Sequence, residues 1–159
     1  LHVTARYLDK DGKVDLKKGN YHEFPAEEWL VLSREEAERL VPPDRAPVEV
    51  DPALATKLLS RLYPLTGNFS GPATNTIAEG SLTARIVAVG KGALWVRLDG
   101  RVTMDHPFFP DRDPRRIEST FTGYVTVDAA TRAVRSVRIA TERGTYGKES
   151  FGVAIRSDP

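Results

Sequence analysis

The chain has no cysteine, so disulfide bonds, thiolate metal sites and cysteine nucleophiles are excluded. It also lacks any apolar run of the roughly eighteen residues that a membrane-spanning helix needs, and we expect no transmembrane segment. Histidine occurs 3 times and methionine once. No G-x-S-x-G, H-E-x-x-H, phosphate-loop or dinucleotide-binding motif is found. The common signatures of hydrolases, zinc proteases, nucleotide-binding proteins and dehydrogenases are therefore missing.

The length and composition predict one globular domain over residues 1–159. The chain is 40% hydrophobic and 28% charged, which is ordinary for a protein that buries a single core. Its net charge of +1 is unevenly distributed, because residues 1–80 carry ten Lys and Arg against thirteen Asp and Glu, whereas residues 81–159 carry thirteen against nine. Asp99, Asp105, Asp111 and Asp113 interrupt the arginine clusters. A nucleic-acid partner is therefore disfavoured.

The chain begins at Leu1 instead of methionine. Such a start is found in a mature protein whose targeting segment has been removed, or in a piece of a longer chain. We expect an exported bacterial protein, periplasmic or extracellular.

The first part, residues 1–65, mixes strand and helix patterns. Alternation in HVTARYL near the start predicts a short strand. Ser33 followed three residues later by Glu36 predicts a capped helix that ends near Val41, before two prolines. Asp51 and Pro52 predict the start of a second amphipathic helix, which continues to Pro64.

Residues 66–81 are rich in Gly, Thr, Asn and Pro and predict a loop between the first part and a strand-rich second part, residues 82–157. There the hydrophobic period becomes two, and turns such as GKG separate the runs. In the run SLTARIVAV, every second residue is apolar and would lie on the same face of a strand, namely Leu82, Ala84, Ile86 and Ala88. The next run predicts a long strand buried on one side by Leu94, Val96, Leu98, Val102 and Met104. Gly100 lies on its apolar face and predicts a bulge or a strong bend.

These patterns predict an α+β fold: two short helices packed on a curved, mainly antiparallel β-sheet arranged as a meander or half-barrel. The run TGYVTVDAATRAVRSVRIAT, residues 122–141, resembles the repeating hairpin of exported bacterial half-barrel proteins that wrap a helix or hold lipid, including the lipoprotein-carrier group. The resemblance covers this run alone. It implies a curved sheet with an apolar concave side.

The segment TMDHPFFPDRDPRR, residues 103–116, is the first candidate for a site. If the long strand continues to His106, Met104 and His106 project from the same apolar face. A thioether beside an imidazole suits copper, and His22 or His2 could supply a third ligand. The alternative is structural, with Met104 in the core and the His106 ring bonded to backbone near the following proline.

The same segment could form the mouth of a ligand site. Phe108 and Phe109 cannot both point inward in an extended chain, so one of them would lie at the rim of whatever the sheet encloses. The ligand-binding candidates are therefore Met104, His106, Phe108 and Phe109. Capping of the core by these two rings is the plainer alternative.

Two further sets of residues are candidates for a site. Asp9, Asp11 and Asp15 only partly match a calcium loop, because Gly12 and Asn20 stand at the wrong positions, so a solvated hairpin turn is favoured. His22, Glu23 or His106 could act as a general base.

The sequence favours a non-catalytic binding or accessory domain that binds a small apolar ligand or a protein partner and has no cofactor. One alternative is a copper protein that uses Met104, His106 and His22. Another is a hydrolase with an unrecognised site.

Overall fold

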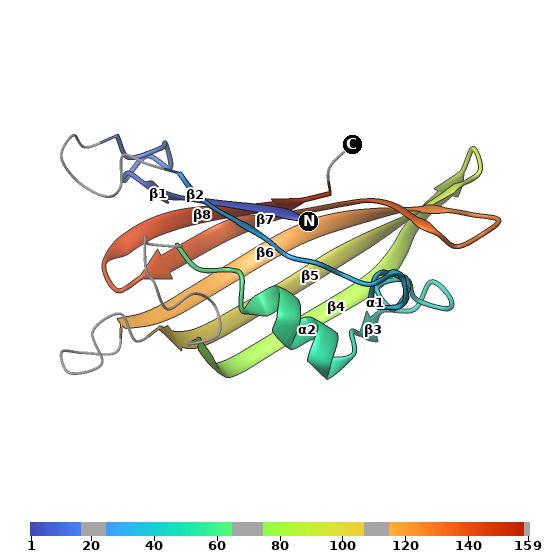
Figure 1. Cartoon of the computed structure of the whole chain (residues 1–159), viewed down its shortest axis with the longest axis horizontal. Coiled ribbons are helices and arrows are strands. Elements are labelled where there is room, and N and C mark those ends of the chain that lie inside the picture. Colours follow the sequence, from blue (N-terminus) through green and yellow to red (C-terminus); the bar gives the residue numbers. More distant parts are fainter. Residues whose placement is uncertain (17–24, 65–74, 107–114, 158–159) are drawn as a thin grey trace.

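The computed structural model describes residues 1–16, 25–64, 75–106 and 115–157. These segments form eight strands and two short helices (Figure 1). The elements follow in the order β1 (His2–Leu8), β2 (Ala26–Trp29), α1 (Arg34–Glu38), β3 (Val48–Glu49), α2 (Pro52–Leu59), β4 (Thr76–Gly90), β5 (Ala93–His106), β6 (Arg115–Asp128), β7 (Val134–Tyr146) and β8 (Glu149–Arg156).

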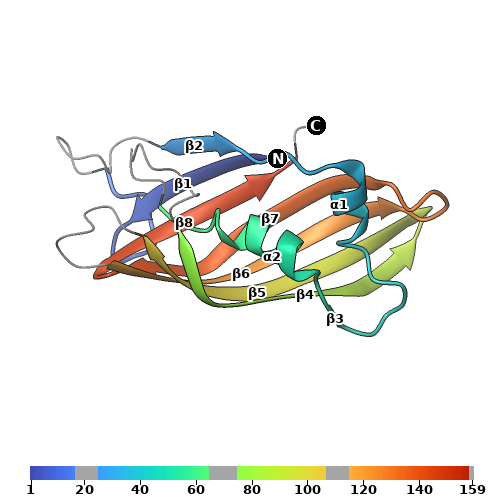
Figure 2. The same cartoon turned by 60° about the horizontal axis from the view of Figure 1, so that its bottom comes forward.

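The eight strands form one open antiparallel sheet in the order β2-β1-β8-β7-β6-β5-β4-β3. Strands β4 to β8 follow one another as a meander, and β8 then pairs with β1. The sheet is visibly curved and is not closed into a barrel (Figure 2). The predicted α+β class with a curved antiparallel meander is confirmed.

In each strand the alternation of apolar and polar residues determines which face is buried. In β5 the side chains of Leu94, Val96, Leu98, Val102 and Met104 are buried, as predicted. They belong to one hydrophobic cluster with the inward residues of the other strands and with Leu54, Leu58 and Leu59 of α2. Leu59 lies directly over Gly80, where an added Cβ would be 2.8 Å from its Cδ1 atom. We call the face of the sheet that contributes to this cluster the inner face and the opposite one the outer face.

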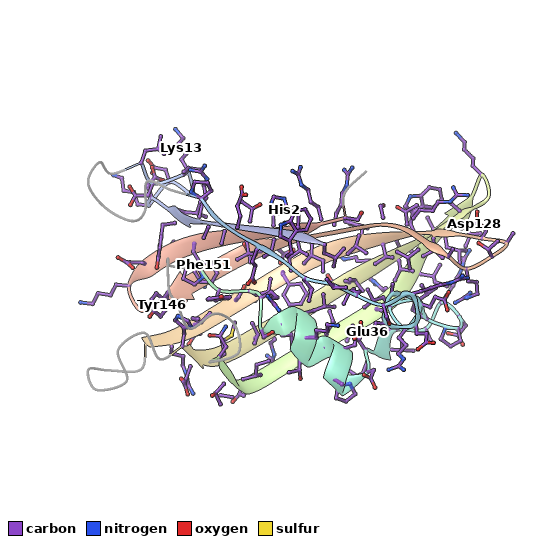
Figure 3. The ribbon with its side chains drawn as sticks, in the orientation of Figure 1. His2, Lys13, Glu36, Asp128, Tyr146 and Phe151 are labelled. Atoms are coloured by element: carbon purple, nitrogen blue, oxygen red, sulfur yellow. The ribbon has the colours of Figure 1, made fainter. Side chains whose placement is uncertain are left out.

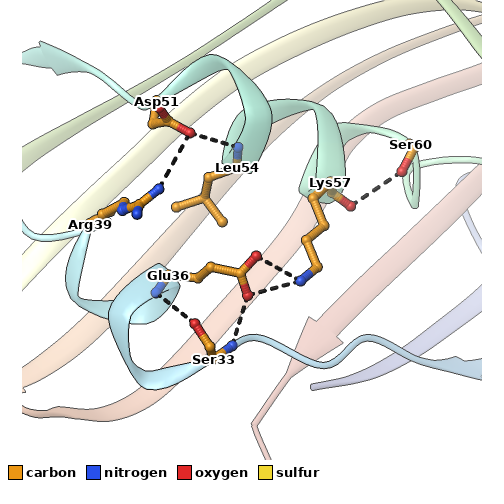
Figure 4. Close-up of polar contacts among 7 residues, drawn as sticks. All are labelled: Ser33, Glu36, Arg39, Asp51, Leu54, Lys57 and Ser60. Atoms are coloured by element: carbon orange, nitrogen blue, oxygen red, sulfur yellow. Dashed lines mark hydrogen bonds and ion pairs between the residues drawn. The ribbon is translucent and has the colours of Figure 1, made fainter.

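Both predicted helix starts are confirmed (Figure 4). Ser33 accepts a hydrogen bond from the Glu36 amide at 3.1 Å, and the Glu36 carboxylate accepts one from the Ser33 amide at 2.7 Å. Asp51 accepts a hydrogen bond from the Leu54 amide at 3.1 Å. Each helix is shorter than predicted, because its last turn tightens into bonds between residues three apart, such as Val41 to Glu38.

Two details of β4 differ from the predictions. Strand β4 begins at Thr76, inside the segment 66–81 that was predicted as a loop, because a register shift between Ile77 and Glu79 hides the alternation. A second shift between Ile86 and Ala88 places Ala88 in an exposed position instead of beside Leu82 and Ala84.

Gly100 does not mark a bulge, one of the two features predicted there. The register of β5 with β6 is continuous from Ala93 to His106, and Gly100 stands opposite Phe121. A Cβ at Gly100 would lie 2.2 Å from Cζ of Phe121. The glycine therefore provides the space that the phenylalanine ring occupies.

Candidate functional site

Strand β5 brings Met104 and His106 to the inner face, two residues apart, as predicted. Both side chains are fully buried. Met104 stands in register between Ile77 of β4 and Ile117 of β6, so its immediate neighbours across the sheet are aliphatic. The candidate site is thus the buried end of β5, and its polar centre is the His106 ring.

The His106 imidazole is held by a side-chain amide. Its Nδ1 atom lies 2.5 Å from Oδ1 of Asn75, whose Nδ2 donates a hydrogen bond to the Ser60 carbonyl at 2.9 Å. Because the Asn75 amide nitrogen is used in this way, its oxygen accepts, and the proton of the neutral imidazole is on Nδ1. Nδ1 of His106 thus contacts the side chain of Asn75, whereas Pro107, near which the alternative contact to backbone was predicted, lies outside the described residues.

Two tyrosines surround the imidazole. The Tyr63 ring centroid is 5.2 Å away and that of Tyr146 is 6.1 Å away in an edge-on arrangement. Tyr146 lies at the end of the sheet opposite the β6–β7 turn that carries Asp128 (Figure 3). Burial raises the pKa of the Tyr63 phenol, so this hydroxyl stays protonated at neutral pH. Within the described residues, His106 therefore lies beside two aromatic rings and a side-chain amide.

Burial also lowers the pKa of His106, which keeps the ring neutral at pH 7. Asn75 orients the imidazole, but a neutral amide cannot stabilise an imidazolium ion as a carboxylate would. The contact with Asn75 therefore satisfies Nδ1 at a buried position but adds no negative charge beside the ring.

The other candidate residues fall into two groups. His22, Glu23, Phe108 and Phe109 lie outside the described residues. His2 is described and lies on the outer face, where it stacks on Trp29 with ring centroids 4.9 Å apart, so it cannot join Met104 and His106 on the inner face. Within the ranges that the structure describes, no three His, Cys, Asp or Glu residues are grouped to hold a metal ion. Copper binding by Met104, His106 and His22 stays a prediction.

Asp9 has a local role in the first turn. Oδ1 of Asp9 accepts hydrogen bonds from the amides of Asp11 and Lys13, both at 2.9 Å. The carboxylate thereby fixes the turn after β1, as short polar side chains do in such turns.

The sequence did not predict a second candidate site, which lies at the β2 edge of the sheet. Glu28 of β2 pairs with Arg61 at 2.8 Å, and both side chains are largely buried. This ion pair attaches β2 to the segment after α2. On the opposite side of β2, Trp29 is 62% exposed, and its ring packs against His2. A lone tryptophan beside two glutamates gives no periodic signal, so the sequence alone does not indicate this arrangement.

Comparison with family models, curated proteins and solved structures finds no match for this chain. Neither helix in the described part of the chain has the length and apolar character needed to cross a membrane.

Proposed function

We propose that the chain is a non-catalytic binding domain for a protein partner, which it contacts through the outer face and the β2 edge of its sheet. The proposal includes the packing of α1 and α2 on the inner face. This packing is supported by the burial of the α2 leucines in the same cluster as the inward residues of the sheet. The outer face and the edges then remain as the surface available to a partner.

The observation that carries the proposal is the exposure of Trp29 on an edge strand. Trp29 and Val31 are 62% and 77% exposed, and stacking on His2 limits the freedom of the indole ring. Tryptophan is among the residues that contribute most to protein–protein binding energy, and little entropy is lost when an already ordered ring is buried. An ordered, exposed tryptophan is therefore a favourable anchor.

The strand itself supports the same conclusion. Among the described strands β2 is the last of the sheet, and its pairing with β1 leaves its other side open. An open edge presents backbone amides and carbonyls that a strand from another protein can pair with. Trp29 would then contact the side chains of the added strand.

A small apolar ligand, the other predicted partner, is supported less well. Val96, Leu98 and Met104 on the inner face of β5 are fully buried. A ligand between the sheet and α2 would have to displace such side chains from a packed cluster, which costs free energy. Binding at the outer surface needs no such rearrangement.

Selection of peptides from a random library against the purified domain tests the proposal. We expect enriched peptides to bind the wild type and to lose about tenfold or more in affinity with Trp29→Ser, as is usual when a hot-spot residue is removed. Val89→Ser, at another exposed apolar position on β4, is the matched control and should leave the affinity unchanged. Failure to enrich any peptide, or binding that is equally strong with Trp29→Ser, would contradict the proposal.

A further inference from the structure

The strand register places seven residues side by side across seven neighbouring strands of the outer face. Each is the direct Cα partner of the next, in the order Arg85, Arg97, Tyr124, Arg138, Arg156, His2 and Trp29. Directly paired residues project from the same face of a sheet. Six strand spacings of about 4.8 Å make the line about 29 Å long. We call this set the arginine row.

The arginine row contains two pairs of like charges in direct opposition, Arg85 with Arg97 and Arg138 with Arg156. Like charges at such positions destabilise a sheet. Arg97 is compensated by Asp99, whose Oδ1 lies 2.8 Å from a guanidinium nitrogen. Within the described ranges, Arg85, Arg138 and Arg156 form no ion pair and are exposed. The row therefore holds uncompensated positive charge in a defined line.

Aromatic rings accompany these charges. Tyr124 stands between Arg97 and Arg138 and is 46% exposed, and the row ends at His2 and the exposed Trp29. Arginine, tyrosine and tryptophan are the residues enriched at the energetic centres of protein interfaces. The composition of the row is thus that of a binding surface and differs from that of an ordinary solvated strand face.

Acidic side chains beside the arginine row decide between two kinds of anionic partner. Asp99 pairs with Arg97, Glu142 accepts a hydrogen bond from Thr122 at 2.6 Å, and Glu27 lies 3.6 Å from His2. A nucleic acid carries a charge on every phosphate and would be repelled at each of these carboxylates. A protein segment can place neutral or basic side chains there and carboxylates over the arginines. The observations favour a protein.

We propose that the arginine row is the docking surface for an acidic segment of a protein partner, one rich in aspartate and glutamate. This inference rests on the proposed function and adds the chemistry of the partner. Carboxylates of the segment relieve the repulsion between the opposed arginines and form hydrogen bonds with their guanidinium groups. Trp29 anchors one end of the segment at the β2 edge.

Fluorescence anisotropy with labelled poly-L-glutamate tests the inference directly. A chain of about 9 residues spans the row when extended. At about 0.15 M ionic strength, we expect it to bind the wild type and to lose about tenfold or more in affinity with Arg138→Glu/Arg156→Glu. Lys10→Glu/Arg45→Glu changes the net charge equally at exposed positions away from the row and should stay within about twofold of the wild type.

Three results would overturn the inference: no binding of poly-L-glutamate to the wild type, equal loss in both double variants, or tighter binding of an oligodeoxythymidylate of equal length. The last would identify a nucleic-acid surface. Peptides from the library selection that need Trp29 but tolerate Arg138→Glu/Arg156→Glu would leave the proposed function standing and reject the arginine row. Circular dichroism and thermal melts of each variant separate a loss of binding from a loss of fold.

Discussion

Gly100 of β5 lies directly opposite Phe121 of β6, and the phenylalanine ring occupies the position where any other residue would place its Cβ. The Cβ of an alanine would be 2.2 Å from Cζ of Phe121 and 2.7 Å from the Ser81 carbonyl oxygen. The two neighbours belong to different strands, so relief of both contacts requires backbone movement.

Gly100→Ala should therefore destabilise the protein by about 1–3 kcal/mol, the usual cost of overfilling a packed core. Urea unfolding followed by circular dichroism measures this change. Gly90→Ala is the matched control, because a Cβ at Gly90 meets no atom within 4 Å and the residue does not adopt a positive φ. A Gly100→Ala protein as stable as the control would show that the ring does not fill this space.

The capping box of α1 gives a second prediction. Ser33→Ala removes the acceptor for the Glu36 amide and should lower the free energy of unfolding by about 0.5–2 kcal/mol. Glu36 also receives hydrogen bonds from Lys57 of α2 at 2.8 Å, so loosening of the first turn is transmitted to the second helix (Figure 4). Ser150→Ala, at an exposed position on β8, serves as the control in the same denaturant series. Equal stability of the two variants would argue against the cap.

Burial of His106 predicts a pH dependence with a defined sign. The pKa of His106 is lowered in the folded protein, whereas the unfolded chain takes up the proton near its ordinary value of about 6.5. The contribution of the neutral ring to stability is thus fully present above about pH 6.5 and is lost as the pH falls through the lower folded-state pKa.

Wild type should therefore lose more unfolding free energy than His106→Gln when the pH is lowered from about 7 to about 5. Glutamine retains an amide donor near Asn75 and does not titrate. Unfolding curves of both proteins at matched pH values provide the comparison. A difference in stability that does not change with pH would mean that the ring has the same pKa in the folded and the unfolded chain, and a wild type that gains stability relative to His106→Gln as the pH falls would mean that the ring carries its proton in the folded state.

Metal titration addresses the copper alternative. Because Met104 and His106 are fully buried and Nδ1 of His106 contacts Asn75, we expect no stoichiometric binding of Cu(I), Cu(II) or Zn(II) to untagged protein at submicromolar concentration. Calorimetry of the wild type, Met104→Leu and His106→Gln measures this. Tight binding that disappears in both variants would establish the metalloprotein instead.

The sequence predicted the parts of the fold that depend on local patterns. The alternation from Leu94 to Met104 identified the buried face of β5, and Ser33 and Asp51 identified the helix starts, because these features involve residues close together in the chain. The exposed position of Ala88 was not predicted, since a bulge changes the alternation without changing the composition.

Features that depend on register could not be read from the sequence. Asn75 and His106 are 31 residues apart, and their contact depends on how β4 and β5 are aligned. The arginine row likewise combines six pairings, each fixed by turn lengths and bulges across the whole sheet. In the sequence its arginines are spaced well apart and have acidic residues near them, so their alignment is not visible, and the sequence disfavours only a nucleic-acid partner.

Chemical-shift mapping tests the central claim, that a partner binds the outer face of the sheet and leaves the interior closed. Isotope-labelled protein is titrated with a peptide from the library selection, and the backbone amide shifts are assigned to strands. The account predicts that the largest changes lie along the arginine row, at Arg138, Arg156 and Trp29, with little change at Leu98 and Met104. Changes concentrated at Leu98, Met104 and His106 would place the ligand in the interior and contradict the account.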